Sequence, residues 1–222
     1  MGTLADNVRT ILSGIPENVD VVAVAKGHTA QEIREVVDAG IRLIGENYLQ
    51  EARSVIPEIG SRVAWHFTGH VQKNKVKLIV PLFDLIQTLD SYELAAMVDE
   101  HAKRHGKVMP VLVEVNSGRE LQKSGVMPGD VPSLIERVHS LQHISVQGLM
   151  TMGPFLDNPE DLRPYFRKTR ILFDEIKAMG IPGAEMRHLS MGMSDSYRIA
   201  IEEGATMVRI GTKIFGPRDY PH

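Results

Sequence analysis

The sequence has 222 residues, of which 43% are hydrophobic, and its 25 basic and 28 acidic residues give a formal net charge of −3. This near-balance provides no general attraction for nucleic acid or for an anionic membrane surface. The chain has no cysteine, which excludes disulfides, thiolate nucleophiles and cysteine-bound metals. No apolar run reaches membrane-spanning length, and the opening MGTLADNVRT lacks the pattern of a signal peptide. We therefore expect a cytoplasmic protein with no nucleic-acid or membrane partner.

The first predicted strand covers residues 21–25, a run of valine and alanine that ends abruptly at Lys26 and Gly27. Such a run is typical of a strand buried on both faces in a parallel sheet. Thr29 and Glu32 form a capping box, which predicts a helix over residues 30–39. A lysine at this strand end points toward the face where β/α folds bind ligands, and its amine could form a Schiff base with an aldehyde. A strand-end lysine whose ammonium simply reaches water is the alternative.

Strands and helices are predicted to alternate along the rest of the chain. After the first, strands are expected over residues 41–45, 63–68, 85–89, 108–115, 144–150, 186–190 and 207–210. The helices between them are expected over residues 49–59, 71–80, 91–104, 131–140, 165–179 and 194–203.

This alternation continues through eight strands with no change in composition that would mark a linker. It predicts an α/β fold, a single (β/α)8 TIM-type barrel, formed by one domain over residues 1–222. Eight units in this length lie at the small end of the range for such barrels. An open doubly wound sheet is the alternative, although it requires fewer strands or an additional edge.

Two segments after the last strands are candidates for a phosphate site. Residues 190–194, SMGMS, lead from the seventh strand toward a helix, whose free N–H groups and dipole favour anions. Residues 209–212, RIGT, follow the eighth strand, and Gly211 permits close approach of a ligand to the backbone. Ser194 could instead be a helix cap and Gly211 a turn residue. Their pairing at adjacent strands favours phosphate, because TIM barrels commonly build phosphate sites there.

A lysine on the first strand opposite a phosphate site on the seventh and eighth suggests pyridoxal 5′-phosphate (PLP), which carries both an aldehyde and a phosphate. Arg209 could then face the pyridine nitrogen of the cofactor. An arginine there would keep that nitrogen unprotonated and weaken the ring as an electron sink.

Other polar groups point less clearly to a function. His66 and His70, and separately His101 and His105, are four residues apart, a spacing that can suit a metal on a helix. The first pair has no third ligand nearby in sequence, and the second lies on the charged segment HAKRH, which is more typical of a solvated face. No metal site is therefore predicted. The basic residues 72–77, QKNKVK, could attract an anion or nucleic acid, but they are more typical of a solvated helix.

Several blocks of the sequence together resemble a known family. In order and spacing, AVAKG, GENYLQE, WHFTGHVQKNK, EVN with KSG, LSMGMS and MVRIGTKIFGPRDY are similar to the YggS/PROSC family of pyridoxal phosphate homeostasis proteins. The resemblance covers nearly the whole chain. It implies a barrel like the N-terminal domain of alanine racemase, with PLP held as an internal aldimine.

The resemblance also implies roles for individual residues. Lys26 would be the Schiff-base lysine, Asn47 would lie near the ring, and Arg209 would face the ring nitrogen. The phosphate would be held by Ser190, Ser194, Gly211 and Thr212. The chain departs from the usual family pattern in two places. Ala25 and Gly27 flank Lys26 where serine and threonine are usual, and Asp195 directly follows Ser194 where the acidic residue usually lies two positions on.

The function implied by the resemblance is intracellular PLP homeostasis, by storage, buffering or delivery, without robust catalytic turnover. PLP-dependent apoenzymes are the candidate partners, and a monomer is expected. A PLP-dependent amino-acid racemase is the alternative, although it needs a second acid/base group that alanine racemase takes from a further domain, and this chain ends at His222. A sugar-phosphate lyase or isomerase that uses Lys26 directly with its substrate is a third interpretation.

Overall fold

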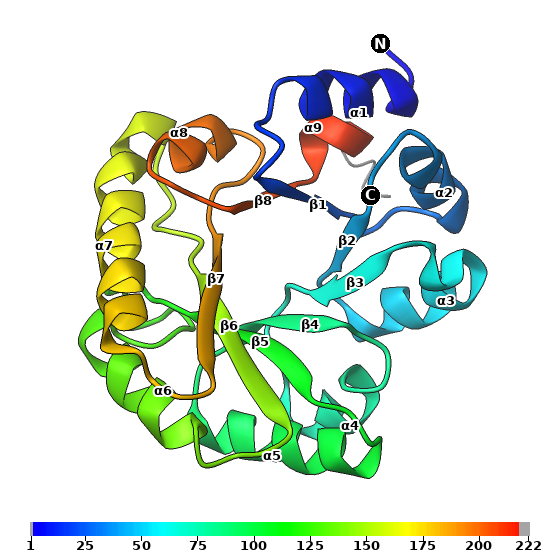
Figure 1. The fold of residues 1–222 in the computed structure, drawn as a ribbon. Coiled ribbons are helices and arrows are strands. Elements are labelled where there is room, and N and C mark those ends of the chain that lie inside the picture. The colour runs from blue at the N-terminus through cyan, green and yellow to red at the C-terminus, as the bar shows by residue number, and fades with distance from the viewer. Residues whose placement is uncertain (1, 218–222) are drawn as a thin grey trace.

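Eight parallel strands pair in sequence order, and β8 closes the sheet onto β1. The structure is a computed structural model that describes residues 2–217. The strands are β1 Asp20–Val24, β2 Leu43–Glu46, β3 Ala64–Phe67, β4 Leu85–Leu89, β5 Met109–Glu114, β6 Ile144–Met150, β7 Ala184–Ser190 and β8 Met207–Ile210. Figure 1 shows them as a ring with helices outside it. The predicted barrel is confirmed, and the pairing of β1 with β8 excludes an open sheet.

The helices follow the strands and cover the outside of the barrel. They are α1 Leu4–Ser13, α2 Ala30–Asp38, α3 Leu49–Ile59, α4 Val76–Ile79, α5 Tyr92–Arg104, α6 Val131–Val138, α7 Arg163–Met179, α8 Tyr197–Glu202 and α9 Thr212–Phe215. The capping box predicted for α2 is present, because Thr29 Oγ1 accepts a hydrogen bond from Glu32 N. Between residues 2 and 217, no helix has both the length and the apolar character that crossing a bilayer requires.

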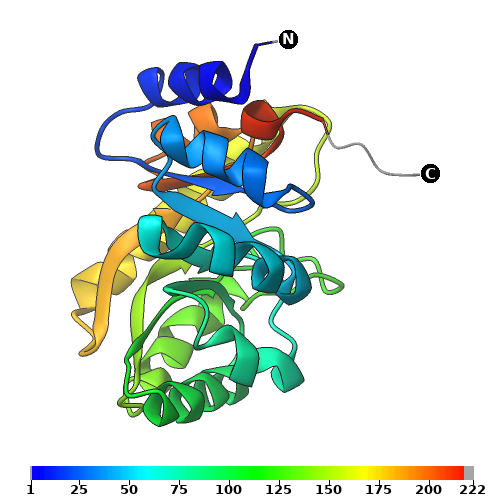
Figure 2. The ribbon, with the colours of Figure 1, turned by 90° about the vertical axis from the view of Figure 1, so that its right-hand side faces the viewer.

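Two helices lie outside the predicted alternation. Helix α1 begins at a capping box formed by Thr3 and Asp6, and its buried residues are Val8 and Ile11. Asn7 Nδ2 donates a hydrogen bond of 3.0 Å to the carbonyl oxygen of Ile214 in α9. Figures 1 and 2 both show α1 and α9 side by side, beside β1 and β8. The two ends of the described chain thus meet where the barrel closes.

Two predicted helices are shorter in the structure. The predicted helix over residues 71–80 consists of a 3₁₀ turn, Lys73–Lys75, followed by α4. The helix predicted from Ser194 begins only at Tyr197. Gly192 has a φ of 84°, and the Ser196 hydroxyl accepts a hydrogen bond from Met193 N, so residues 191–196 turn before the helix starts.

Strand residues alternate between two environments, because successive side chains point to opposite faces of a sheet. In β8, Val208 and Ile210 belong to the apolar layer between the strands and the helices. Arg209 lies between them and therefore points into the barrel, where its strand neighbour on β1 is Val22. The interior also holds a small apolar cluster of Leu85, Leu112 and Met150. The barrel interior is therefore packed with side chains, so the candidate functional site lies at the strand ends.

Candidate functional site

The carboxyl ends of the eight strands open on one face, called here the barrel mouth. Lys26 lies two residues after β1 and is partly buried there. Gly27 follows with a φ of 78°, a conformation that glycine adopts without strain. Its N–H donates a hydrogen bond of 2.8 Å to Glu51 Oε2 in α3. A hydrogen bond thus ties the turn that carries Lys26 to the neighbouring helix. The positive φ at position 27 explains why glycine fits there, where the family usually has threonine.

The amine of Lys26 faces an aromatic ring. Its Nζ lies 4.8 Å from the centre of the Tyr48 ring, within the range of a cation–π contact. Tyr48 is the residue before α3 and is about half exposed. The Lys26 side chain therefore reaches the barrel mouth at a place that is open to solvent, where a ligand could contact its amine.

Below the mouth, a chain of hydrogen bonds crosses the barrel interior. Arg209 Nη1 donates to the Ser190 hydroxyl at 2.6 Å, and that hydroxyl donates to Gln87 Oε1 at 2.7 Å. Gln87 Nε2 lies 3.0 Å from His66 Nδ1. A second guanidinium nitrogen, Arg209 Nη2, donates to the Thr151 carbonyl oxygen at 3.0 Å. We call Arg209, Ser190, Gln87 and His66 the polar floor of the site.

Burial sets the charges of this floor. It lowers the pKa of Arg209 to about 10, and the nearby Glu114 carboxylate opposes that shift. The guanidinium consequently keeps its proton at neutral pH. Burial lowers the pKa of His66 to about 4, so its imidazole is neutral there. The floor thus presents one buried positive charge to whatever lies above it.

Glu114, at the end of β5, adds a titratable group to the mouth. Burial raises the pKa of its carboxyl to about 7, and the nearby charge of Asp90 raises it further, whereas Arg209 opposes the shift. The side chain lines a cavity of about 270 Å³ over the β3–β6 half of the mouth. Sequence reasoning missed Glu114. The available signal was a carboxylate at the end of an otherwise apolar strand, two residues before Asn116.

The segments predicted to bind phosphate come together at the ends of β7 and β8. The Ser194 hydroxyl accepts hydrogen bonds from Gly211 N at 3.3 Å and from Lys213 N at 3.5 Å. Ser194 therefore contacts the start of α9, whereas the prediction placed it at the start of the helix that follows β7. Thr212, the first residue of α9, is exposed.

Two other predicted residues lie apart from this group. Ser190 is fully buried, and its hydroxyl is engaged by Arg209 and Gln87, as described above. Its predicted contact with phosphate stays a prediction. Asn47, at the end of β2, is partly buried, and its Oδ1 accepts a hydrogen bond of 2.9 Å from the Thr68 hydroxyl. Asn47 also lines the cavity over the mouth.

The residues around Lys26 and Ser194 fit a ligand that combines an aldehyde with a phosphate. β1 and β8 are hydrogen-bonded neighbours, so the turn carrying Lys26 and the start of α9 emerge side by side. The two hydrogen bonds to the Ser194 hydroxyl are long, at 3.3 and 3.5 Å, so an anion could take over these N–H groups with little loss. The Thr212 hydroxyl is exposed beside them. An amine and a set of anion-binding donors therefore share one edge of the mouth.

His66 belongs to the floor, and His70 Nδ1 lies 3.9 Å from Asp90 Oδ2 at the mouth. Among residues 2–217, no group of three or more histidine, cysteine or acidic side chains is placed to hold a metal ion. Of the block MVRIGTKIFGPRDY, the residues after Pro217 lie outside the described part of the chain.

The chain is similar to known proteins along nearly its whole length. The model of the alanine racemase N-terminal domain matches residues 1–219. A relative from Aquifex aeolicus (strain VF5), called pyridoxal phosphate homeostasis protein, is 44% identical over 189 residues, which are 85% of this chain and 82% of the relative. A relative with the same name from Pasteurella multocida (strain Pm70) is 37% identical over 92% of this chain and 89% of its own length.

The fold is also similar to that of a solved protein, PipY of Synechococcus elongatus PCC7942. Without PLP, PipY superposes with a TM-score of 0.91 at 32% identity, over 96% of this chain and 100% of PipY. With PLP bound, the TM-score is 0.88 over the same shares. Together with the matches in sequence, these findings show that the chain belongs to the alanine racemase N-terminal domain family and, within it, to the pyridoxal phosphate homeostasis proteins.

Proposed function

We propose that this protein binds pyridoxal 5′-phosphate through the amine of Lys26 and acts in intracellular PLP homeostasis, by storing, buffering or delivering the cofactor. The observation that carries the proposal is that the turn carrying Lys26 emerges from β1 beside the start of α9, because β1 and β8 are paired. The name shared by its relatives and the PLP-bound PipY structure support it.

Each residue of the site would have a defined task. Lys26 would hold the cofactor covalently, and the Ser194 hydroxyl, the Gly211 N–H and the Thr212 hydroxyl would bind its phosphate. Ser190 would keep Arg209 in place beneath the ring, through the hydrogen bond that joins them. Asn47, fixed by Thr68, would contact the edge of the ring. When bound, the cofactor supplies an aldehyde carbon that forms a reversible bond to an amine.

We further propose that the bound cofactor supports no robust turnover. Arg209 is buried and keeps its charge at neutral pH, because its pKa stays near 10. A positive charge at the ring nitrogen opposes protonation of that nitrogen, so the ring withdraws electrons less strongly. The alternative is an amino-acid racemase, for which Glu114 is the one specific observation, since its carboxyl can exchange a proton near neutral pH.

Partners and assembly follow from the same proposal. PLP-dependent apoenzymes would receive the cofactor in the cytoplasm. We propose a monomer, because a closed barrel leaves no free sheet edge along which a second copy could pair. Light scattering after size-exclusion chromatography measures the assembly directly.

An absorbance titration tests the main proposal. Added PLP should produce a visible band from the lysine-bound cofactor, and the loaded protein should then restore activity to a PLP-dependent apoenzyme. A protein that binds no PLP, but reacts through Lys26 with a sugar phosphate, would produce no such band and would support the lyase interpretation.

A further inference from the structure

A second cavity lies beside the candidate cofactor site, between the start of α3 and the segment that leads into α4. Its volume is about 470 Å³, within the range of small-molecule sites. We call it the α3–α4 pocket. It is lined by Asn47, Tyr48, Leu49, Gln50, Phe67, Gly69, His70, Gln72, Lys75 and Ile79. All of them except Ile79 belong to two blocks of the sequence, GENYLQE and WHFTGHVQKNK, and Asn47 is the one among the ten to which the proposed function gives a role.

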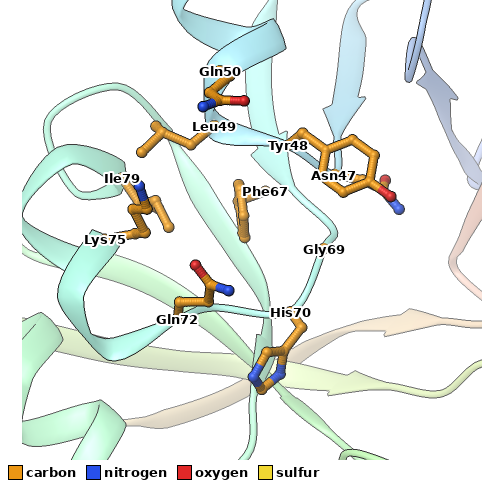
Figure 3. Close-up of a pocket in the computed structure, with 10 residues that line it drawn as sticks. All are labelled: Asn47, Tyr48, Leu49, Gln50, Phe67, Gly69, His70, Gln72, Lys75 and Ile79. Carbon is orange, nitrogen blue, oxygen red and sulfur yellow. The ribbon is translucent and has the colours of Figure 1, made fainter.

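The pocket combines an apolar base with polar groups around it. In Figure 3, Gln50, Gln72 and Lys75 surround Phe67 on three sides. Leu49, Phe67 and Ile79 are buried residues of the core, so the base is firm and apolar. A firm apolar base favours a flat ligand, because a ring loses little conformational freedom when it packs against such a surface.

The charges indicate the sign of the ligand. None of the ten residues that line the pocket is acidic, and Lys75 is the lysine among them. The side-chain amides of Gln50 and Gln72 can each donate hydrogen bonds, and the ammonium of Lys75 can donate three. An anionic group would therefore meet a positive charge and several donors, whereas a cation would meet no carboxylate.

The pocket adjoins the candidate site without using its phosphate-binding residues. Tyr48 lines the pocket, yet in Figure 3 its ring turns away from Phe67, toward the side of Asn47. That ring lies over Lys26 Nζ, at 4.8 Å. Lys26, Ser194, Gly211 and Thr212 are not among the residues that line the pocket. The turn before α3 thus lies between the α3–α4 pocket and the Lys26 amine.

We propose that the α3–α4 pocket is a second ligand site, which binds a small molecule with a flat apolar ring and an anionic carboxylate or phosphate group held by Lys75, Gln50 and Gln72. The site uses neither Lys26 nor the proposed phosphate-binding residues. Because its ligand would contact the turn that carries Tyr48, binding would also change the surroundings of the Lys26 amine.

A titration followed by ¹H–¹⁵N NMR tests this proposal with four named probes. Phenyl phosphate and benzoate carry a ring with either anionic group, benzamide is a neutral molecule of similar shape, and inorganic phosphate is an anion without a ring. Phenyl phosphate or benzoate should shift the side-chain amide signals of Gln50 and Gln72, and the stronger of the two identifies the anionic group. Benzamide and inorganic phosphate should bind at least tenfold more weakly. Shifts confined to the amides of Gly192 and Gly211 would place the probe in the phosphate site and overturn the proposal.

Matched variants test whether Lys75 holds the anionic group of the ligand. Lys75→Gln should weaken binding of the preferred probe about tenfold, as expected for loss of a hydrogen bond to a charged group. Gln72→Glu should weaken it further, because it places a carboxylate in the pocket. Lys77→Gln is the control, since Lys77 is exposed in α4, directly after the turn that carries Lys75, and does not line the pocket. Equal weakening by Lys75→Gln and Lys77→Gln, or equal affinity for benzamide and the anionic probes, would overturn the proposal. Either result leaves PLP binding at Lys26 untouched.

Discussion

Arg209 and Ser190 form the shortest link of the polar floor, with 2.6 Å between the Nη1 nitrogen and the serine oxygen. Both side chains are buried, and the serine hydroxyl also donates to Gln87. Ser190→Ala leaves the guanidinium and the Gln87 oxygen without this partner, so we expect a loss of about 1–3 kcal/mol of unfolding free energy. Urea unfolding measures it.

Ser140→Ala is the control for this loss, because the Ser140 hydroxyl donates only to a carbonyl oxygen at the exposed end of α6. It should change stability by less than about 0.5 kcal/mol. Ser190→Ala should also reduce affinity for PLP and for pyridoxal by the same factor. A larger loss for PLP would show that Ser190 binds the phosphate directly, as the sequence predicted.

Thr212 gives a test of the phosphate site. Thr212→Val keeps nearly the same volume but removes the hydroxyl from the first residue of α9. Loss of one hydrogen bond to a charged group costs about 1.5–3 kcal/mol, so PLP affinity should fall roughly ten- to a hundredfold. Pyridoxal lacks the phosphate and should lose much less. Comparable losses for both ligands in an absorbance titration would place the phosphate elsewhere.

The burial of Glu46 makes the free energy of unfolding depend on pH. Its side chain is fully buried at the end of β2, and neither carboxyl oxygen has a hydrogen-bond partner among the described residues. Burial raises the pKa of its carboxyl from the ordinary value of 4.5 to about 8, and the nearby charge of Glu51 contributes to this rise. As pH rises through this window, the unfolded chain loses the proton first while the native state retains it. This group therefore lowers stability progressively from pH 4.5 to pH 8.

Glu46→Gln removes that dependence, since glutamine stays neutral. The variant should gain stability relative to the parent across this window, by at most about 1.4 kcal/mol per pH unit. Thermal unfolding at several pH values measures the difference, with Glu136→Gln on the exposed face of α6 as the control. A difference that stays constant with pH would show that Glu46 is ionised in the native state.

Much of the barrel could be predicted because its signals are local. Valine-rich runs indicate strands that are buried on both faces of the sheet, and the capping box at Thr29 indicates the start of α2. The strand that ends at Lys26 was predicted over residues 21–25 and extends over Asp20–Val24. Helix α1 has an equally local signal, the capping box of Thr3 and Asp6, but it precedes the first strand and so falls outside the strand–helix alternation.

The polar floor could not be predicted, because it depends on which strands face one another across the closed barrel. Gln87 lies within the run LIQTL, where nothing nearby in sequence shows that it meets Ser190, 103 positions later. Glu114 acquires its raised pKa from burial and from Asp90 on the preceding strand's end. The contact of Ser194 with α9 could not be predicted either, because it depends on the turn at Gly192.

The absence of robust turnover is tested with alanine. In the proposed complex the charge of Arg209 would lie below the ring, so the cofactor should activate an amino acid poorly. We expect loaded protein to convert neither L-alanine nor D-alanine above a trace in a chiral assay, and Arg209→Glu alone should not change this. Turnover on the order of 1 s⁻¹ or faster would support the racemase alternative, and its loss in Glu114→Gln would identify Glu114 as the acid/base group.

An absorbance spectrum of Lys26→Ala with added PLP shows most directly whether Lys26 holds the cofactor. Lys26 lies at the rim and is only partly buried, so the variant should fold with an unchanged melting temperature. Lys123→Ala is the matched control, because Lys123 also lines the mouth, on the β5 side. We expect added PLP to give no lysine-bound band in Lys26→Ala and a full band in Lys123→Ala. A full band in Lys26→Ala would contradict this expectation and show that another lysine holds the cofactor.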